Sequence, residues 1–408
     1  MPAVNTLKEN KLSQLRSNFR KTNVAFDPIK IIELNKFLDG INLPTTKDEA
    51  WKYTRLTKLS TSSFSGESLP SYLMPIESTA YRIVFENGKL ISSNVNINYK
   101  SIHDLTSKEL SIATVKNEVF DALNYVYAND GIYLDISSSF DKPVEIVHIS
   151  NGDIAYNLRH IIKLNALAKA EISLVFEGNE NSKGFSNVVT EIFLEKGAHL
   201  NMNKLQIASG DDIYFNREKI RQNRDSIFKL NTITLDGQFT RNDVEVDVEG
   251  ENAETHLNGV FVINNQQFVD NHTTIDHKVA NCQSNELYKG VLFDKATAVF
   301  NGKVMVRKDA QKINAFQSNA NILMSPDATI NAKPELEIYA DDVKCSHGST
   351  TGQLDEEAVF YLRSRGISDK AARNLLVSSF IGQVLEHIEN DEILARVEKT
   401  LYNRFGWE

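Results

Sequence analysis

The chain has 408 residues, 41% of them hydrophobic, and carries a formal net charge of −9 at neutral pH. This length permits a sizeable core, either in one elongated domain or in about two or three compact ones. The acidic balance, with Lys and Arg dispersed among Asp and Glu, argues against a nucleic-acid partner. No stretch approaches the roughly 18 consecutive apolar residues of a membrane span.

The N-terminal sequence and the cysteine content indicate the cellular compartment. The N-terminus lacks the apolar segment of a signal peptide. Cys282 and Cys345 are the two cysteines of the sequence, which is too few for a disulfide framework and leaves no Cys-x-x-Cys pair. We therefore expect a cytoplasmic protein with reduced thiols and no membrane segment.

The first predicted elements are helices. Apolar residues recur at helical spacing across residues 5–39, and Asp27, followed by proline, predicts the start of a second helix in this region. Residues 41–75 are rich in Ser, Thr and Pro and predict an irregular covering loop whose Trp51 packs against an apolar surface. Residues 1–75 are thus predicted to be an N-terminal helical cap with a covering loop.

A hairpin is predicted to open the β-rich part of the chain. The alternating residues 81–86 are joined to residues 89–91 by Asn87 and Gly88, a pair that favours a tight two-residue turn. Residues 103–127 then predict one helix, because apolar residues return to helical spacing there. From the end of that helix onwards, short β-branched runs broken by Gly, Asn and Asp predict strands.

A loose internal repeat extends through the β-rich region. Small residues precede alternating apolar runs, separated by 28, 28, 27, 43, 14 and 18 residues. These small residues are Ala170, Ala198, Ser226, Ala253, Ala296, Ala310 and Ala328. Strands at such intervals favour a solenoid, because one coil cannot bury its apolar face alone whereas stacked coils form a continuous core. We predict a mainly β fold with a parallel β-helix over residues 76–353, and a β-sandwich as the alternative.

The helical period returns after the repeat. Asp355 and Ser368 are predicted N-caps of two helices, and a third helix is expected from Asp391 towards Phe405. Residues 354–408 are thus predicted to be a C-terminal helical region. We expect the helices at the two termini to cover the two open ends of the solenoid, and one face of the tail also to be available to a partner.

The most chemically suggestive residues lie just before this tail. Cys345 and His347 are two residues apart, so in a strand their side chains share a face at roughly 7 Å separation. A thiolate suits iron–sulfur chemistry and an imidazole suits iron or zinc. The spacing alone is a weak signal, and a packed cysteine beside a hydrogen-bonded histidine is the alternative interpretation.

A second group of residues with metal-binding side chains lies earlier in the chain. It consists of His272, Asp276, His277 and Cys282. In an alternating strand the two histidines fall on opposite faces unless a turn intervenes. We therefore expect no metal site there.

Several motifs resemble the SufB/SufD family of iron–sulfur cluster assembly proteins. The segment DDVKCSHGSTTGQLDEEAVFYLRSRGIS, residues 341–368, is similar to the C-terminal core of the SufD branch, whereas the SufB branch lacks the cysteine. The segment LPTTKDEAWKYT, residues 43–54, is similar to the N-terminal signature of the family. Residues 270–277 and 284–290 also resemble it, so that the similarity covers nearly the whole chain.

This resemblance implies a fold and a function. The fold is a right-handed parallel β-helix flanked by N- and C-terminal helical regions. The function is that of a non-catalytic scaffold subunit that pairs with a SufB-like paralogue, binds a SufC-like ATPase and passes nascent clusters to apo-proteins. Cys345 and His347 would lie at the interface with the paralogue, with His347 the stronger candidate ligand. The tail residues suggested for partner binding are Leu375, Leu376, Phe380 and Val384.

We do not expect this chain to hold a cluster alone. A permanent [4Fe-4S] site usually takes about four cysteines, and the two cysteines here are far apart in sequence. A transient cluster shared with the partner is therefore expected. The resemblance also implies that the isolated chain can form a homodimer through the same surface when its partner is missing.

Two enzymatic functions are alternatives. A carbohydrate-active β-helix enzyme needs paired carboxylates on one exposed face, whereas the Asp pairs at 211–212 and 341–342 are adjacent and so face opposite ways in a strand. A thiol enzyme using Cys345 and His347 needs an exposed thiol with a lowered pKa. The sequence has no phosphate-binding Gly-x4-Gly-Lys-Ser/Thr loop and no Gly-x-Ser-x-Gly elbow, so ATP hydrolysis is not expected of this chain.

Overall fold

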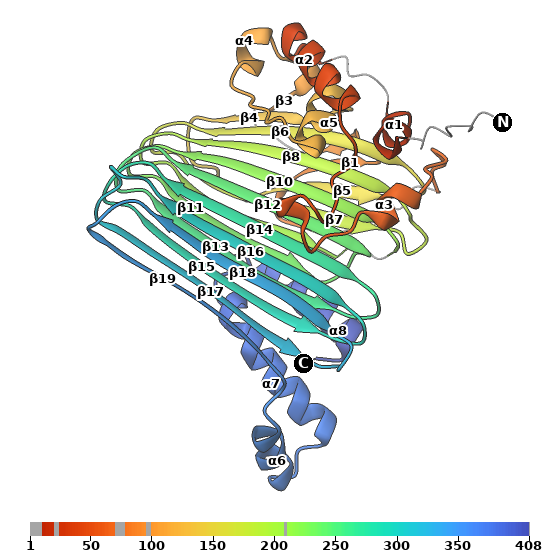
Figure 1. The fold of residues 1–408 in the computed structure, drawn as a ribbon, viewed down its shortest axis with the longest axis vertical. Coiled ribbons are helices and arrows are strands. Elements are labelled where there is room, and N and C mark those ends of the chain that lie inside the picture. The colour runs from red at the N-terminus through yellow and green to blue at the C-terminus, as the bar shows by residue number, and fades with distance from the viewer. Residues whose placement is uncertain (1–9, 20–23, 70–77, 95–98, 208–209, 408) are drawn as a thin grey trace, which may run out of the picture.

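The computed structural model describes residues 10–19, 24–69, 78–94, 99–207 and 210–407. Its strands wind into a solenoid of two facing sheets, with helices towards both ends of the chain (Figure 1). Successive strands through most of the chain alternate between the sheets, so each coil contributes one strand to each. The predicted mainly β, parallel solenoid with N- and C-terminal helical regions is confirmed.

Within the described residues, one sheet has ten strands and the other has nine. In spatial order the ten-stranded sheet contains β19 (Val343–Gly352), β17 (Ile313–Leu323), β15 (Gln283–Leu292), β13 (Glu254–Ile263), β11 (Ile227–Thr234), β9 (His199–Gln206), β7 (Lys169–Gly178), β5 (Val144–Ser150), β1 (Tyr81–Glu86) and β2 (Lys89–Ser93). The nine-stranded sheet contains β18 (Thr329–Ile338), β16 (Thr297–Val306), β14 (Phe268–His277), β12 (Phe239–Val248), β10 (Ile213–Gln222), β8 (Phe185–Leu194), β6 (Ala155–Leu164), β4 (Ile132–Ile136) and β3 (Tyr99–Ser101). The predicted hairpin is confirmed as β1 and β2, which pair in the antiparallel sense.

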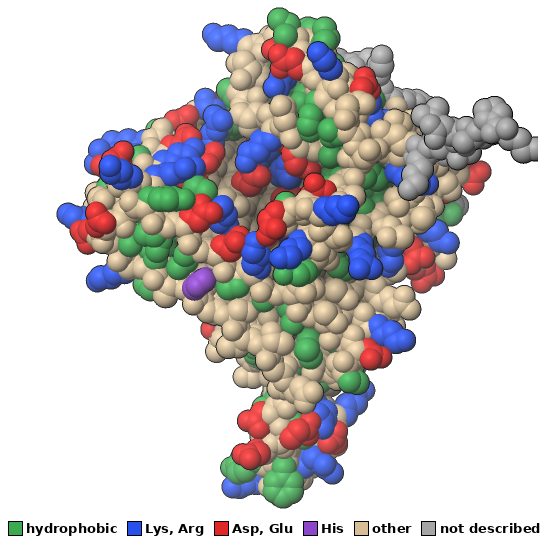
Figure 2. All heavy atoms as spheres, viewed as in Figure 1, with side chains coloured by type: hydrophobic (Ala, Val, Ile, Leu, Met, Phe, Trp, Pro, Cys, Tyr) green, Lys and Arg blue, Asp and Glu red, His purple; other side chains and the backbone are tan. Residues whose placement is uncertain are grey.

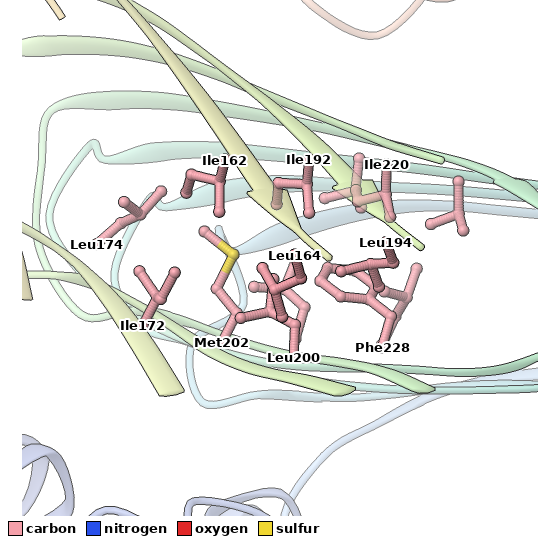
Figure 3. Close-up of a cluster of buried hydrophobic side chains, with 14 of the residues drawn as sticks. Ile162, Leu164, Ile172, Leu174, Ile192, Leu194, Leu200, Met202, Ile220 and Phe228 are labelled. Atoms are coloured by element: carbon pink, nitrogen blue, oxygen red, sulfur yellow. The ribbon is translucent and has the colours of Figure 1, made fainter. Parts of the chain in front are cut away.

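Stacked apolar side chains fill the space between the sheets. Because parallel pairing is in register, Ile162 stacks on Ile192 and Ile192 on Ile220 along the nine-stranded sheet. Ile172 and Met202 stack in the same way on the facing sheet, and Figure 3 shows the two rows directed towards one another. Each coil therefore buries its apolar side chains against its neighbours, which is the physical reason for the repeat.

Small residues occupy corners of the solenoid, although the predicted ones do not share a single corner. Ala296 and Ala328 precede β16 and β18 of the nine-stranded sheet, whereas Ala198, Ser226 and Ala253 precede strands of the ten-stranded sheet. The carbonyls of Ala198 and Ser226 each accept a backbone hydrogen bond from the next coil. The prediction of Ala170 as the small residue of its coil is wrong by two positions, because Ala168 occupies the corner there. This corner column contains Ala168, Ala198, Ser226, Ala253 and Cys282, all of them buried. Cys282 thus fills the place of a small packing residue.

The N-terminal region is helical, as predicted. It contains α1 (Lys11–Arg16), α2 (Pro28–Asp39), a 3-10 turn (Glu49–Trp51) and α3 (Thr57–Thr61). The Asp27 side chain caps α2, whereas residues 5–9 of the first predicted helix lie outside the described residues. Trp51 is buried, and its ring centroid lies 5.4 Å from that of Phe120 and 6.0 Å from that of Phe215. The predicted packing of Trp51 is therefore confirmed.

The single helix predicted for residues 103–127 is wrong. The segment contains a 3-10 turn (Ile102–Asp104), α4 (Ser107–Leu110) and α5 (Val119–Tyr127). Between α4 and α5, the Thr114 N–H donates a hydrogen bond to the buried Glu191, and the Lys116 N–H donates one to Asp121. These bonds to carboxylates take the place of helical backbone bonds, so the chain lies against β8 instead of continuing as a helix.

The C-terminal region contains α6 (Glu356–Ser364), α7 (Asp369–Leu385) and α8 (Asp391–Phe405). The predicted caps are confirmed, because the side chains of Asp355 and Ser368 accept backbone N–H groups at the starts of α6 and α7. Within the described residues, no helix is both long and apolar enough to cross a membrane.

The expectation that helices cover both ends of the solenoid is wrong at the C-terminal end, and the N-terminal region also packs along a side, where α5 contacts β6 and β8 of the nine-stranded sheet. α7 packs against β13 and β15, and α8 contacts β9, all on the outward face of the ten-stranded sheet. Outward-facing apolar residues form a stripe there, which includes Val175, Leu205, Ile233, Val260 and Val291. Burial of this stripe draws the helices to the side of the solenoid. As a result β18 and β19 are edge strands, with no described strand beyond them (Figure 1).

Candidate functional site

Cys345 and His347 lie on β19, the last strand of the ten-stranded sheet. In the parallel register, Cys345 is opposite Ala315 and His347 is opposite Gln317 of β17. Ala315 and Gln317 are buried on the inward face of β17, and residues opposite each other in a parallel pair share a face. Cys345 and His347 therefore both face the interior, at the open end of the solenoid.

The surroundings of the two side chains differ. Cys345 is half-buried and packs against the main core, whereas His347 is exposed. Burial raises the pKa of the Cys345 thiol, and a backbone hydrogen bond from Ala315 offsets that rise only in part. A thiol enzyme needs a lowered thiol pKa, so the structure argues against this alternative.

An apolar column inside the solenoid becomes polar in the last three coils. The in-register positions from β5 to β13 are Val144, Ile172, Met202, Leu230 and Leu257. The next three positions in the same column are Glu286, Gln317 and His347. A carboxyl group and an amide thus stand directly behind His347.

Glu286 and Gln317 are both buried and are bound to each other. Gln317 Nε2 donates to Glu286 Oε2 at 2.5 Å, and Thr273 Oγ1 donates to the same oxygen at 3.2 Å. Burial raises the pKa of Glu286 to about 7, although the two hydrogen bonds act in the opposite direction. The sequence-based predictions include neither residue, yet the alternation of Ser284, Glu286 and Tyr288 is a signal that places this carboxyl on an inward face.

Proteins of known family share this sequence over most of its length. The domain described as SUF system FeS cluster assembly, SufBD core domain, matches residues 147–380, which is more than half of the chain. The chain belongs to the SufBD family. The resemblance based on the motifs around Cys345 and Trp51 is therefore confirmed.

Two relatives illustrate the extent of the SufBD similarity. The chain is 30% identical over 397 residues to an iron-sulfur cluster assembly SufBD family protein of Synechocystis sp., with 89% of this chain and 87% of the relative covered. It is 29% identical over 378 residues to the iron-sulfur cluster assembly protein SufD of Escherichia coli, with 88% of this chain and 89% of the relative covered. Both alignments extend well beyond the core domain, so the chain is a SufD-like member of the SufBD family.

The four tail residues suggested for partner binding differ in exposure in this SufBD-family chain. Leu375 on α7 is 51% exposed, whereas Leu376 and Phe380 pack partly against the solenoid and Val384 is fully buried there. Lys289 of β15 helps to fix the helix by donating a hydrogen bond to the Phe380 carbonyl at 2.7 Å. Leu375 is therefore the one of the four most available to a partner, and the binding role of all four stays a prediction.

The residues considered for a second metal site do not converge. They are His272, Asp276, His277 and Cys282. His272 pairs with Asp270 at 2.8 Å, while His277 is buried and bonds Ser284. The Cys282 thiol donates to the backbone carbonyls of Ala280 in its own turn and of Gly250 in the preceding coil. The described residues contain no cluster of three or more His, Cys, Asp and Glu side chains that could hold a metal ion.

The structure gives little support to the alternative of a carbohydrate-active enzyme, which requires a pair of exposed carboxylates. Asp212 is buried and accepts hydrogen bonds from Ser182, Tyr214 and the backbone N–H of Gly184. Burial raises the pKa of Asp212 to about 7. Asp211 and Asp212 therefore do not form an exposed carboxylate pair, and the SufBD match gives no support to glycan chemistry.

Proposed function

We propose that this SufBD-family chain is a non-catalytic scaffold subunit that pairs with a SufB-like paralogue through the open end of its solenoid. The observation that carries the proposal is the last coil, where edge strand β19 bears Cys345 and His347 on its inward face. The unpaired N–H and C=O groups of an edge strand favour pairing with another chain. Without the paralogue, the same edge would support pairing between two copies of this chain.

The nascent cluster is the cargo of this interface and is shared between the subunits. The two cysteines of the chain are on different coils, Cys282 in a buried corner and Cys345 at the edge, so a complete thiolate set must come from more than one chain. Burial opposes ionisation of Cys345, whereas His347 is exposed. His347 is accordingly the stronger ligand candidate, with Cys345 beside it, and the cluster is passed on to apo-proteins.

The helical tail is the proposed docking site for a SufC-like ATPase. α6 and the adjoining part of α7 project away from the solenoid (Figure 1), and the projection carries both charged and apolar side chains (Figure 2). Phe360, Tyr361 and Leu375 are all more than half exposed. A groove of about 710 Å³ also lies between α7 and α8, with Ile381, Leu394 and other apolar residues in its wall. Exposed apolar side chains of this kind favour a protein partner.

Anaerobic reconstitution of the coexpressed three-subunit complex tests the proposal. His347→Ala is expected to lower the yield of cluster several-fold, and Cys345→Ala to lower it less. Lys344→Ala, on the exposed outward side of the same strand, is the matched control and should leave the yield unchanged. Because these positions lie at the edge of the solenoid, the variants should fold and assemble normally. A cluster yield in the His347→Ala complex equal to that of the wild type would contradict the proposal.

A further inference from the structure

The polar column behind His347 has no evident structural purpose. Five coils of the same column are apolar and support the solenoid without a polar group. A buried carboxyl group is costly to place in a core unless its hydrogen bonds are satisfied. Glu286 Oε1 and Gln317 Oε1 are nevertheless buried oxygens without a hydrogen-bond partner among the described residues. Of the two, Gln317 Oε1 belongs to β17, the strand paired with β19, and so is the oxygen available to a further ligand beside His347.

The orientation of the Gln317 amide is fixed by its surroundings. Its Nε2 donates to Glu286, so the oxygen of the same planar amide is directed away from that carboxylate. From the opposite sheet, Gly302 leaves room for this side chain, because a Cβ at that position would lie 2.3 Å from Gln317 Nε2. The bond to Glu286 thus orients the amide, Gly302 leaves room for it, and the amide oxygen stays free to bind a further ligand.

We propose that Gln317 Oε1 is a second ligand, with the His347 imidazole, for a divalent iron ion, and that Glu286 positions the Gln317 amide. The inference rests on the proposed function, since it concerns the same end of the solenoid. Gln317 and His347 are opposite each other on neighbouring strands, which are about 4.8 Å apart. Two side chains on one face at this spacing can converge on a single ion, and nitrogen and oxygen donors both suit Fe²⁺.

Glu286 acts through Gln317 and not on the metal. Its Oε2 accepts hydrogen bonds from both Gln317 and Thr273, which ties the amide on β17 to β14 of the facing sheet. Partners of this kind fix the direction of a ligand, and their loss typically weakens metal binding by about 10–100-fold. This role explains why a carboxyl group, that of Glu286, lies in the core: it orients Gln317, the proposed ligand near the edge of the sheet.

The test is anaerobic calorimetric titration of the full chain with Fe²⁺ alone. Gln317→Leu removes the oxygen and is expected to weaken binding by about tenfold or more, and His347→Ala should weaken it at least as much. Gln283→Leu is the matched control, because Gln283 is an exposed glutamine on neighbouring β15, and it should bind as the wild type does. Gln317→Asn keeps the amide but withdraws the oxygen, so it replaces Gln317→Leu if that variant folds poorly.

The role of Glu286 is tested with two further variants. Glu286→Gln keeps an oxygen that can accept from Gln317 and should retain most of the affinity, whereas Glu286→Leu should lose it. The visible absorption of bound Co²⁺ reports the ligand set directly and should shift in Gln317→Leu and Glu286→Leu but not in Glu286→Gln. A purely structural role for Glu286 would change the thermal unfolding temperature and leave the Co²⁺ spectrum unaltered, which would overturn its assignment as a positioning residue.

The outcomes separate this inference from the proposed function. If His347→Ala weakens Fe²⁺ binding and both Gln317 variants bind as the wild type does, the inference is overturned and His347 remains a ligand candidate. If the wild-type chain alone binds no Fe²⁺, or if His347→Ala binds it equally well, the inference is overturned, whereas the proposed function, in which the ligands are shared with a partner, is judged by the cluster yield of the complex. Weaker binding in the His347 and Gln317 variants, with an unchanged Gln283 control, supports the inference.

Discussion

Gly259 shows how closely the interior of the solenoid is packed. It lies on β13 in register with Tyr288 of β15, whose buried ring is 5.0 Å from the ring of Phe300. A Cβ at position 259 would lie 2.2 Å from Tyr288 Cε1. Because Phe300 and the neighbouring coils enclose this ring, it has no free space to move into, and glycine is required for packing at this position.

Gly259→Ala is therefore expected to destabilise the protein. Overpacking of a closed core costs about 1–3 kcal/mol, so the free energy of unfolding measured by urea denaturation should fall by that amount. Gly348→Ala is the matched control, because a Cβ there meets no atom within 4 Å, and its stability should equal that of the wild type. Equal stability of the two variants would contradict the packing argument.

At the scale of elements, α7 has one face that packs against the solenoid and one that is exposed. Val377, Ile381 and Val384 are buried against the outward stripe of the ten-stranded sheet, whereas Leu375 is mostly exposed. The buried face holds the tail against the solenoid. The exposed face is available for the proposed ATPase. Deleting the tail would uncover the apolar stripe, so point variants separate docking from stability better than truncation does.

Val384→Ala and Leu375→Ser should have opposite consequences. Truncation of the buried Val384 is expected to lower the free energy of unfolding by about 1–3 kcal/mol and to leave ATPase binding largely intact. Leu375→Ser should change stability by less than about 0.5 kcal/mol and weaken copurification with the SufC-like ATPase. Denaturant titration and pull-down of the coexpressed complex measure the two effects. Undiminished copurification of Leu375→Ser would remove Leu375 from the partner surface.

At the scale of the whole molecule, the solenoid buries histidines in its core. His148 Nε2 and His160 Nε2 are 2.9 Å apart, and both side chains are buried. Burial lowers the pKa of His160 to about 3 and lowers that of His148 well below its usual range, with the charge of His160 adding to the latter effect. Both rings are therefore neutral in the folded protein at pH 7, and the pair shares one proton between facing nitrogens.

Stability should consequently decrease in acid. An unfolded histidine has a pKa of about 6.5, so below that pH the unfolded chain binds protons that the folded chain does not. The free energy of unfolding should fall by up to about 1.4 kcal/mol per pH unit for each of His148 and His160. Glu286 and Asp212, whose pKa values burial raises to about 7, act in the opposite direction. The contribution of the two histidines is therefore measured as the difference in pH dependence of the free energy of unfolding between the wild type and a variant that lacks both.

Urea denaturation between pH 7 and pH 5 of the wild type and of the His148→Leu/His160→Leu chain isolates the two rings. The double variant is expected to lose less stability on acidification, because it lacks both groups. Its absolute stability matters less than its pH dependence, since leucine also changes the packing beside Phe85 and Phe176. Parallel pH profiles for the two proteins would show that the histidines do not contribute.

The sequence by itself determined the features that depend on neighbouring residues. The caps at Asp27, Asp355 and Ser368 and the turn at Asn87 follow from local hydrogen bonding and local backbone preference. The stacking of coils followed from the repeat of small residues and alternating strands. The same locality explains why the motif around Cys345 identified the SufBD family. The domain limits at residues 75 and 353 stay predictions.

Only the tertiary structure decided which residues of different coils meet. Successive in-register residues are 27 positions apart from Leu230 to Leu257 but 31 apart from Glu286 to Gln317, so no constant spacing in the sequence identifies the column behind His347. The break in the helix predicted for residues 103–127, and the binding of the tail to the side of the solenoid, likewise depend on distant partners. Contacts of this kind depend on how whole coils pair and bury their side chains against one another. No single stretch of the sequence determines that arrangement.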